Sequence, residues 1–408
     1  MSRGGLPQEA YAAALAGLDQ MTPRRLGLMT RSGEPLGRIW EGLASGRPAR
    51  RGILARLAAA EPAALAAWER EAPTVDVAAL WRRCAGDAVL ILGHPGYPEV
   101  LERDPLPPAV LFARGEVGLL HELGRPGEPS GAEGAGRPDE VRPRERRTDR
   151  RRRSVAVVGT RNATAGGLEA AAALGRDLAA VGVSVVSGLA KGIDGAAHRG
   201  ALAARGGAPP IGVVASGLDV VYPRQHAELW EEVSARGLLC TEAPPGTRPA
   251  AHRFPARNRI LAALAELLVV VESRRKGGSL LTVTEAERRG LPIMAVPGSI
   301  RSPASEGSNL LLVDGATPVL ELLDVVVALG LEDRPAVRRR RVDRRVPPDP
   351  GDRDLLELLG TDAVTLDTLV LRSGRAIGEV AVALGRLEAA GWLARSGAWF
   401  ELTGAGRA

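Results

Sequence analysis

Six short apolar segments between residues 154 and 330 alternate with segments of helical periodicity, and this alternation restricts the fold more than any other feature. The apolar segments, rich in β-branched residues, are Val155–Val158, Val183–Val186, Ile211–Ala215, Leu238–Thr241, Leu267–Val271 and Ile293–Val296. The helical segments between them are Ala165–Val181, Ile193–Ala204, Gln225–Arg236, Ala256–Ala265 and Leu280–Gly290. Such strands, apolar throughout and separated by helices, are typical of a parallel sheet covered on both faces. The sequence therefore predicts an α/β fold, an extended Rossmann-like doubly wound parallel sheet over residues 154–330.

The regions on either side predict two smaller domains. Residues 1–85 indicate a small helical (SAM-like) domain through four short amphipathic segments, Tyr11–Leu18, Leu36–Leu43, Ile53–Ala60 and Ala63–Glu71. Its first half could be a helix-hairpin-helix DNA module, although LDQMTPRRL lacks the hairpin glycines. Residues 86–123 hold two apolar strands that lead into the Rossmann-like domain. Residues 353–408 carry three helical segments and then two short strands around Ser396-Gly397, which suggests a winged-helix domain.

Most of the net positive charge lies in two segments that separate these domains. Residues 124–153 predict a disordered Arg-rich insertion, and 331–352 a basic linker. Val141–Arg153 has a net charge of +6 and Arg338–Arg345 of +5, against +6 for the whole chain, so the remainder is about −5. Both segments are solvated linkers or add non-specific phosphate binding. If the folded domains bind nucleic acid, they therefore need a local cluster of positive charge, because their overall charge is not positive.

Several functional classes have no support in the sequence. The two cysteines, Cys84 and Cys240, lie far apart, which argues against a disulfide framework or zinc site and fits a reducing compartment. The chain has no secretory h-region and no apolar run of membrane-spanning length, so we expect a cytoplasmic protein without membrane contact. P-loop, G-x-G-x-x-G and G-x-S-x-G motifs are missing, as are metal-ligand spacings. We therefore expect no cofactor, no metal and no catalytic residue: a binding protein rather than an enzyme.

Four segments place glycines, hydroxyls or cations where parallel strands end or where a helix begins. They are Gly159–Arg161, Ser187–Gly192, Arg253–Ile260 and Ser273–Thr282. The carboxyl edge of an open parallel sheet is where ligands bind, and helix starts favour anions. The only two lysines, Lys191 and Lys276, both lie in these loops beside glycines. Four such loops on one edge predict a site for several phosphates.

Each feature also has a structural interpretation. Gly159 and Gly188 could simply allow tight strand exits, and Ser279 and Thr282 could be helix N-caps. The side chains of Arg257 and Arg259 could lie on a solvated helix face. Asp194 is expected to be an N-cap or a helix-dipole partner rather than a catalytic acid, and His198 a structural histidine.

The motifs of the central domain resemble those of one known family. VAVVGTR, SGLAKGIDGAAHRGAL, FPARNRILAALAELLVVVE, GGSLLT and AVPGSIRSPASEGSNLLLVDGA look like the successive motifs of the DNA-processing protein A (DprA, or Smf) family. HPGYPEVLERDPLPPAVLFARG is similar to the segment that precedes them. The resemblance covers about 88–123 and 154–325 and implies an extended Rossmann fold. It further implies a homodimer formed through that domain, which binds single-stranded DNA and loads the RecA recombinase during natural transformation and recombination.

The resemblance also assigns candidate DNA contacts at the matching positions. Together with the glycines and lysines of the loops, the predicted DNA-binding residues are Gly159, Arg161, Ser187, Gly188, Lys191, Arg257, Asn258, Arg259, Lys276, Gly278, Ser279, Thr282 and Asn309. The family usually has Ser-Gly-Ser-Leu where this chain has Gly277-Gly-Ser-Leu280, so one hydroxyl contact is lost. Recognition would rest on the phosphate backbone. With 3% aromatic residues, extended base stacking is not expected.

Two other functions are consistent with parts of the sequence. The run GGSLLTVTE is loosely similar to the loop of Rossmann-like nucleotide hydrolases of the lysine-decarboxylase-like group, in which Glu285 would be catalytic. Its spacing is one residue too long, and the third glycine is missing. Alternatively, the tail could be the main functional part, acting as a transcriptional regulator.

Overall fold

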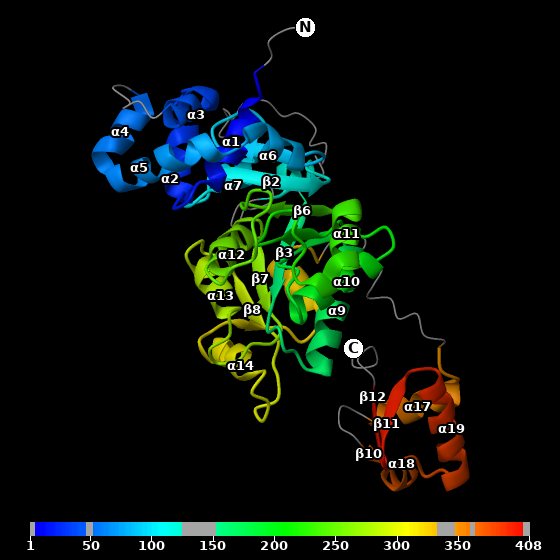
Figure 1. Ribbon diagram of the computed structural model, residues 1–408. Coiled ribbons are helices and arrows are strands. Elements are labelled where there is room, and N and C mark those ends of the chain that lie inside the picture. The colour runs from blue at the N-terminus through cyan, green and yellow to red at the C-terminus, as the bar shows by residue number, and fades with distance from the viewer. Residues whose placement is uncertain (1–4, 46–51, 125–151, 333–346, 360–363, 403–408) are drawn as a thin grey trace, which may run out of the picture. The chain divides into compact units, whose positions relative to one another are not determined.

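The computed structural model describes residues 5–45, 52–124, 152–332, 347–359 and 364–402 (Figure 1). The chain forms two compact units, Met1–Glu332 and Asp333–Ala408. Within the described residues, no helix is long and apolar enough to span a bilayer, and no group of three or more His, Cys, Asp or Glu side chains is arranged to hold a metal ion.

A nine-stranded sheet forms the centre of the first unit, with strand order β1-β2-β6-β5-β4-β3-β7-β8-β9. The strands are β1 Ala88–Ile91, β2 Val110–Gly115, β3 Arg153–Val158, β4 Val183–Ser187, β5 Ile211–Val213, β6 Leu238–Thr241, β7 Leu267–Val270, β8 Ile293–Ala295 and β9 Thr317–Pro318. In the part of the sheet from β6 to β9, all pairings are parallel. At the other edge, β2 pairs antiparallel with both β1 and β6. The predicted doubly wound parallel sheet is confirmed, and it is longer than expected by β9.

The helices of this sheet lie on its two faces. They are α9 Ala165–Ala180, α10 Ile193–Ala203, α11 Ala227–Arg236, α12 Arg253–Ala263, α13 Leu280–Glu287, α14 Glu306–Val313 and α15 Leu322–Ala328. Figure 1 shows α9, α10 and α11 on one side of the strands and α12 and α13 on the other. The chain winds from β3 to β6 in one direction and then returns to place β7 beside β3. This reversal is the topological switch point, outside which such sheets bind ligands.

Six helices precede the sheet: α1 Gln8–Gly17, α2 Pro23–Thr30, α3 Leu36–Ala44, α4 Gly52–Ala60, α5 Pro62–Glu71 and α6 Val77–Arg83. Their apolar faces share one buried cluster with β1, β2 and α11, in which Trp68 and Trp230 are enclosed. Apolar periodicity did not predict α2 and α6. Their signals are N-caps: Thr22 accepts from Arg25 N, and Asp76 accepts from Ala79 N.

The predicted insertion begins and ends at neighbouring points of the fold. Gly124 N donates to Arg152 O over 3.1 Å, and the Arg152 side chain pairs with Glu122. Arg153, placed in the insertion by the sequence, instead opens β3 and forms a salt bridge of 2.6 Å with Glu266. Two arginines of the basic run therefore belong to the folded unit, while 125–151 lie outside the described residues.

Short helices α7 Glu99–Glu102 and α8 Leu119–Glu122 follow β1 and β2, respectively.

The second unit has the arrangement expected of a winged helix. Its helices are α17 Pro350–Leu359, α18 Leu366–Ser373 and α19 Ile377–Ala389, and its sheet has the order β10-β12-β11, with β10 Val364–Thr365, β11 Leu393–Ser396 and β12 Trp399–Leu402. The predicted turn is present, because β11 and β12 pair antiparallel and Gly397 between them has φ +64°. Leu355, Leu369 and Leu384 are in its buried core.

Candidate nucleic-acid interface

Two adjoining clefts lie where β3, β4, β5 and β7 end. Their volumes are about 550 Å³ and about 210 Å³. Four residues line both: Arg161, Asn162, Ala190 and Phe254. Ten of the thirteen predicted residues line one or both clefts: Gly159, Arg161, Gly188, Lys191, Arg257, Asn258, Lys276, Gly278, Ser279 and Thr282. Ser187, Arg259 and Asn309 line neither.

The loop after β3 presents Arg161 and is held by a residue at the end of β7. Glu272 accepts from Thr160 N through its carbonyl over 2.7 Å, and its carboxylate accepts from Thr164 N (3.0 Å) and Oγ1 (2.6 Å). Arg161 itself is exposed, with its guanidinium carbon 4.4 Å from the Phe254 ring centroid. The loop is thus fixed at both ends and leaves its cation at the cleft surface.

The loop after β4 presents Lys191. Gly188 N donates to the buried carboxylate of Asp194 over 3.1 Å, and Leu189 has a left-handed φ of +52°. The Asp194 carboxylate therefore points back into the loop instead of capping α10, whose N-cap is Gly192. Ser187 is fully buried, and its hydroxyl donates to Val157 O over 2.6 Å, so it is a structural residue rather than a phosphate ligand.

The two arginines of the RNRI motif are buried; Arg257 lines the larger cleft, whereas Arg259 lines neither. Arg257 is 7% exposed and donates to Val213 O and, over 3.2 Å, to Asn258 Oδ1. Burial lowers the pKa of Arg257 to about 10. Arg259 is 4% exposed, pairs with Glu242 and donates to Leu106 O over 2.8 Å. Neither guanidinium lies on a solvated helix face.

The loop after β7 contributes cations from its exposed part and hydroxyls from its buried part. Lys276 and Gly278 are exposed. Ser279 occupies the N-cap position of α13, but its hydroxyl donates to Ser273 Oγ over 2.9 Å instead of capping the helix. Thr282 lines the larger cleft and is only 2% exposed.

Asn309 holds a different loop. Its side chain accepts from Gly298 N and donates to Gly298 O, both over 3.0 Å, and so closes the segment between β8 and α14. Both ends of the amide are engaged in this loop, so Asn309 supports the fold and is not presented to the clefts.

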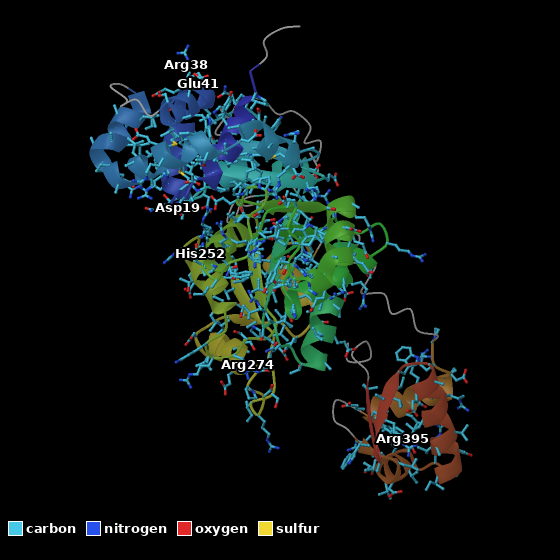
Figure 2. The ribbon with its side chains drawn as sticks, viewed as in Figure 1. Asp19, Arg38, Glu41, His252, Arg274 and Arg395 are labelled. Atoms are coloured by element: carbon cyan, nitrogen blue, oxygen red, sulfur yellow. The ribbon has the colours of Figure 1, made fainter. Side chains whose placement is uncertain are left out.

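Sequence reasoning overlooked three side chains that line the clefts. Arg274 is exposed, and Figure 2 labels it beside α14, whose Gly307 N donates to Ser273 O over 2.6 Å. Phe254 and Tyr222 form a tilted aromatic pair with ring centroids 5.9 Å apart. Arg274 lies in the segment Ser273–Thr282 and Phe254 in the motif FPARNRI, so both belong to segments that the sequence indicated. A low total of aromatic residues says nothing about whether two of them meet.

The resulting electrostatics favour an anion. Arg161, Lys191, Arg274 and Lys276 are exposed, line the clefts and form no salt bridge within the part of the chain that the structure describes. Among the described residues that line the clefts, the only acidic one is Asp194, which is buried. Burial raises the pKa of Asp194, and the nearby Arg257 charge opposes that rise.

The residue proposed for the enzyme alternative is engaged elsewhere. The carboxylate of Glu285 accepts from Arg288 and Arg289, at 2.6 and 2.7 Å, and Glu285 lines neither cleft.

His198 is buried, with Nε2 3.2 Å from Ile211 O, which matches its interpretation as a structural histidine.

Comparison with known proteins identifies the family. The chain is 41% identical over 279 residues to the putative DNA processing protein DprA of Mycobacterium tuberculosis, an alignment that covers 67% of this chain and 69% of the relative. This chain belongs to the DprA/Smf family. The family model described as DNA recombination-mediator protein A matches residues 146–330, and the DprA winged helix domain matches residues 342–398.

Other members of the DprA family agree. The DNA processing protein DprA of Bacillus subtilis is 34% identical over 56% of this chain and 67% of its own length. The solved structure of DprA from Streptococcus pneumoniae superposes with a TM-score of 0.57 and 26% identity, over 79% of this chain and 98% of that one. The fold expected from the resemblance, a Rossmann-like sheet with a C-terminal winged helix, is confirmed.

Proposed function

We propose that this chain binds single-stranded DNA along the two adjoining clefts, mainly through its phosphates. The observation that carries the proposal is the row of four exposed cations, Arg161, Lys191, Arg274 and Lys276, at the carboxyl edge of the sheet, with no carboxylate partner among the described residues. A folded protein rarely gathers unpaired cations around a concave surface unless an anion occupies it. Because the cations come from three loops, a chain of phosphates fits them better than a single phosphate.

The aromatic pair favours an unpaired strand over a duplex. Phe254 lines both clefts, and Tyr222 lines the smaller one. A base can reach such a ring only when it is unstacked from its neighbours, as in single strands. Stacking on one or two rings does not read sequence. We therefore expect little preference among bases.

We further propose that the bound strand is passed to the RecA recombinase during DNA uptake, natural transformation and recombination. The support is the family assignment and the description of its model as a recombination mediator.

We also propose that the chain forms a homodimer through the Rossmann-like domain. The apolar side chains of Val313 and Leu320, 81% and 79% exposed, could supply part of its surface. Light scattering of the full chain measures the dimer, and RecA filament growth on single strands measures the loading.

The decisive experiment is a titration of a fluorescent thymidine oligonucleotide and of a matched duplex at several salt concentrations. For a single strand, the logarithm of affinity falls with that of salt by about 0.7 per phosphate neutralised. Arg161→Gln and Lys191→Gln should each lower this slope by about 0.7 and weaken binding about fivefold to tenfold. Arg205→Gln is the matched control, because Arg205 is exposed beyond the other end of α10. Unchanged slopes in the first two variants, or tighter binding of the duplex, would disprove the proposal.

A further inference from the structure

Two buried charged residues lie directly beneath the loop that presents Lys191. The carboxylate of Asp194 accepts from Gly188 N over 3.1 Å and also from the backbone of Ala190. The guanidinium of Arg257 fills the space below Gly188: a Cβ there would lie 2.1 Å from Arg257 Nη1. A side chain at position 188 would displace the Arg257 guanidinium, so the present place of this arginine depends on the glycine.

Two of the five N–H donors of Arg257 bond within the protein. Nη1 donates to Val213 O at the end of β5, and Nε donates to Asn258 Oδ1. Arg257 comes from α12, whereas Asp194 comes from α10 on the opposite face of the sheet. The two charges stabilise one another electrostatically, without a salt bridge between them in the described structure. Together they connect both helical layers to one loop.

The loop also needs this support, because its backbone is strained. Leu189 has φ +52°, a conformation that bulky residues rarely adopt unless the surroundings impose it. His226 contributes as well, with Nδ1 2.9 Å from Leu189 O. Gly188, Ala190 and Lys191 all line the smaller cleft. The buried side chains of Asp194, Arg257 and His226 therefore determine the shape of the smaller cleft.

We propose that Arg257 and Asp194 are positioning residues, which hold residues 188–191 in the conformation that binds DNA, and that Arg257 does not contact phosphate itself. This inference rests on the proposed function of the clefts. It separates two roles for arginine: Arg161 supplies charge to the strand, and Arg257 supplies shape to the loop. Substituting a residue that contacts phosphate lowers the dependence of DNA affinity on salt, whereas substituting a positioning residue weakens binding without changing that dependence.

The test compares Arg257→Met and Arg257→Lys with Lys191→Gln. For a positioning residue, both Arg257 variants bind the thymidine oligonucleotide about tenfold more weakly, with the salt slope of the unchanged protein. Lysine does not rescue binding, because an ammonium cannot reproduce the planar fork of donors. A slope lowered by about 0.7 in Arg257→Met, together with recovery in Arg257→Lys, would instead make Arg257 a phosphate ligand and overturn the inference.

Hydrogen exchange without DNA provides an independent measurement. In the unchanged protein, the amides of Gly188 and Ala190 should exchange as slowly as that of Val185 in β4, although they belong to a loop. In Asp194→Asn, and in those Arg257 variants that fold, exchange at 188 and 190 should accelerate at least tenfold while Val185 stays protected. Fast exchange at 188 and 190 in the unchanged protein, or equal acceleration at Val185, would refute positioning. If the unchanged protein fails to bind DNA, only the proposed function falls, because exchange still tests the pair.

Discussion

The edge of the clefts and the winged helix differ in how they use arginine. At the carboxyl edge of the large sheet, exposed cations line the clefts without a carboxylate partner among the described residues. In the winged helix, Arg386 pairs with Asp352, while Arg372 and Arg375 donate to backbone carbonyls. Arg395, labelled in Figure 2, donates to Gly397 O and lies over the Phe400 ring. The edge of the clefts presents its exposed cations, whereas these four arginines of the winged helix are engaged within their own unit.

This contrast bears on what a winged helix does. In helix-turn-helix proteins that read duplex DNA, the second helix of the motif enters the major groove and needs donors for bases and phosphates. The exposed positions of α19 include Ile377, Val382 and Glu379, and its only arginine is the paired Arg386. Such a surface is poorly suited to a phosphate backbone. The fold alone therefore does not make the tail a duplex reader.

The largest expected effect separates the two units by stability. Leu384 is 1% exposed in the small core of the winged helix. Leu384→Ala should cost about 3 kcal/mol, as is typical of a buried leucine, which is much of the stability of a domain this small. Proteolysis and hydrogen exchange of the full chain should show unfolding confined to residues 347–402. The affinity for single strands should stay within twofold, and a parallel loss of affinity would contradict the division of roles.

The second effect separates them by charge. The double variant Arg161→Glu with Lys191→Glu should bind single strands about 100-fold more weakly, equivalent to about 2.7 kcal/mol. The matched double variant Arg372→Glu with Arg395→Glu changes the same number of charges in the winged helix. It should change affinity less than threefold. Anisotropy titrations at one salt concentration decide between these outcomes, and equal losses from both pairs would show that the two units share the DNA.

The third effect is a pH dependence that belongs to the first unit alone. Burial lowers the pKa of His198 to about 4, below its ordinary value of about 6.5, so the unfolded chain takes up a proton that the folded chain refuses. Stability is therefore full above pH 6.5 and is lost as the pH falls toward 4. Between pH 7 and pH 5 the loss from His198 should be about 2 kcal/mol, and His226, whose pKa burial also lowers, adds to the loss in the same direction. All five histidines lie between residues 94 and 252, so the stability of the winged helix should not fall through histidine protonation. Calorimetry that finds the same decline in both units would contradict the assignment to His198.

Much of the sheet could be predicted because its strands are buried on both faces. The predicted segment Leu238–Thr241 matches β6, and Ile211–Ala215 exceeds β5 by two residues. Buried strands leave continuous apolar runs that need no partner to be recognised. Helix α2 was missed although the sequence marks its start, because Thr22 is its N-cap and Pro23 its first residue.

The site was predicted less completely, for a geometric reason. Arg257 and Arg259 are two positions apart on a helix, so their side chains point to different sides and cannot both face one cleft. The partners that bury Arg259 are Glu242 and Leu106, the latter 153 positions away in the chain. Only the folded structure shows that such distant residues meet. A motif of basic residues therefore indicates where a site lies better than it indicates which of them touch the ligand.

The smallest expected effect is the removal of the second unit. A chain ending at residue 332 retains the whole nine-stranded sheet and every residue that lines the clefts. It should bind a thymidine oligonucleotide within twofold of the full chain at moderate salt. The basic run Arg338–Arg345 is removed as well, so a chain ending at residue 346 serves as the control for its non-specific contribution. If the shorter chain binds more weakly only at low salt, the linker arginines account for the difference. If both truncated chains lose affinity equally at all salt concentrations, the winged helix itself contacts the strand, and the contrast between presented and engaged arginines no longer explains where DNA binds.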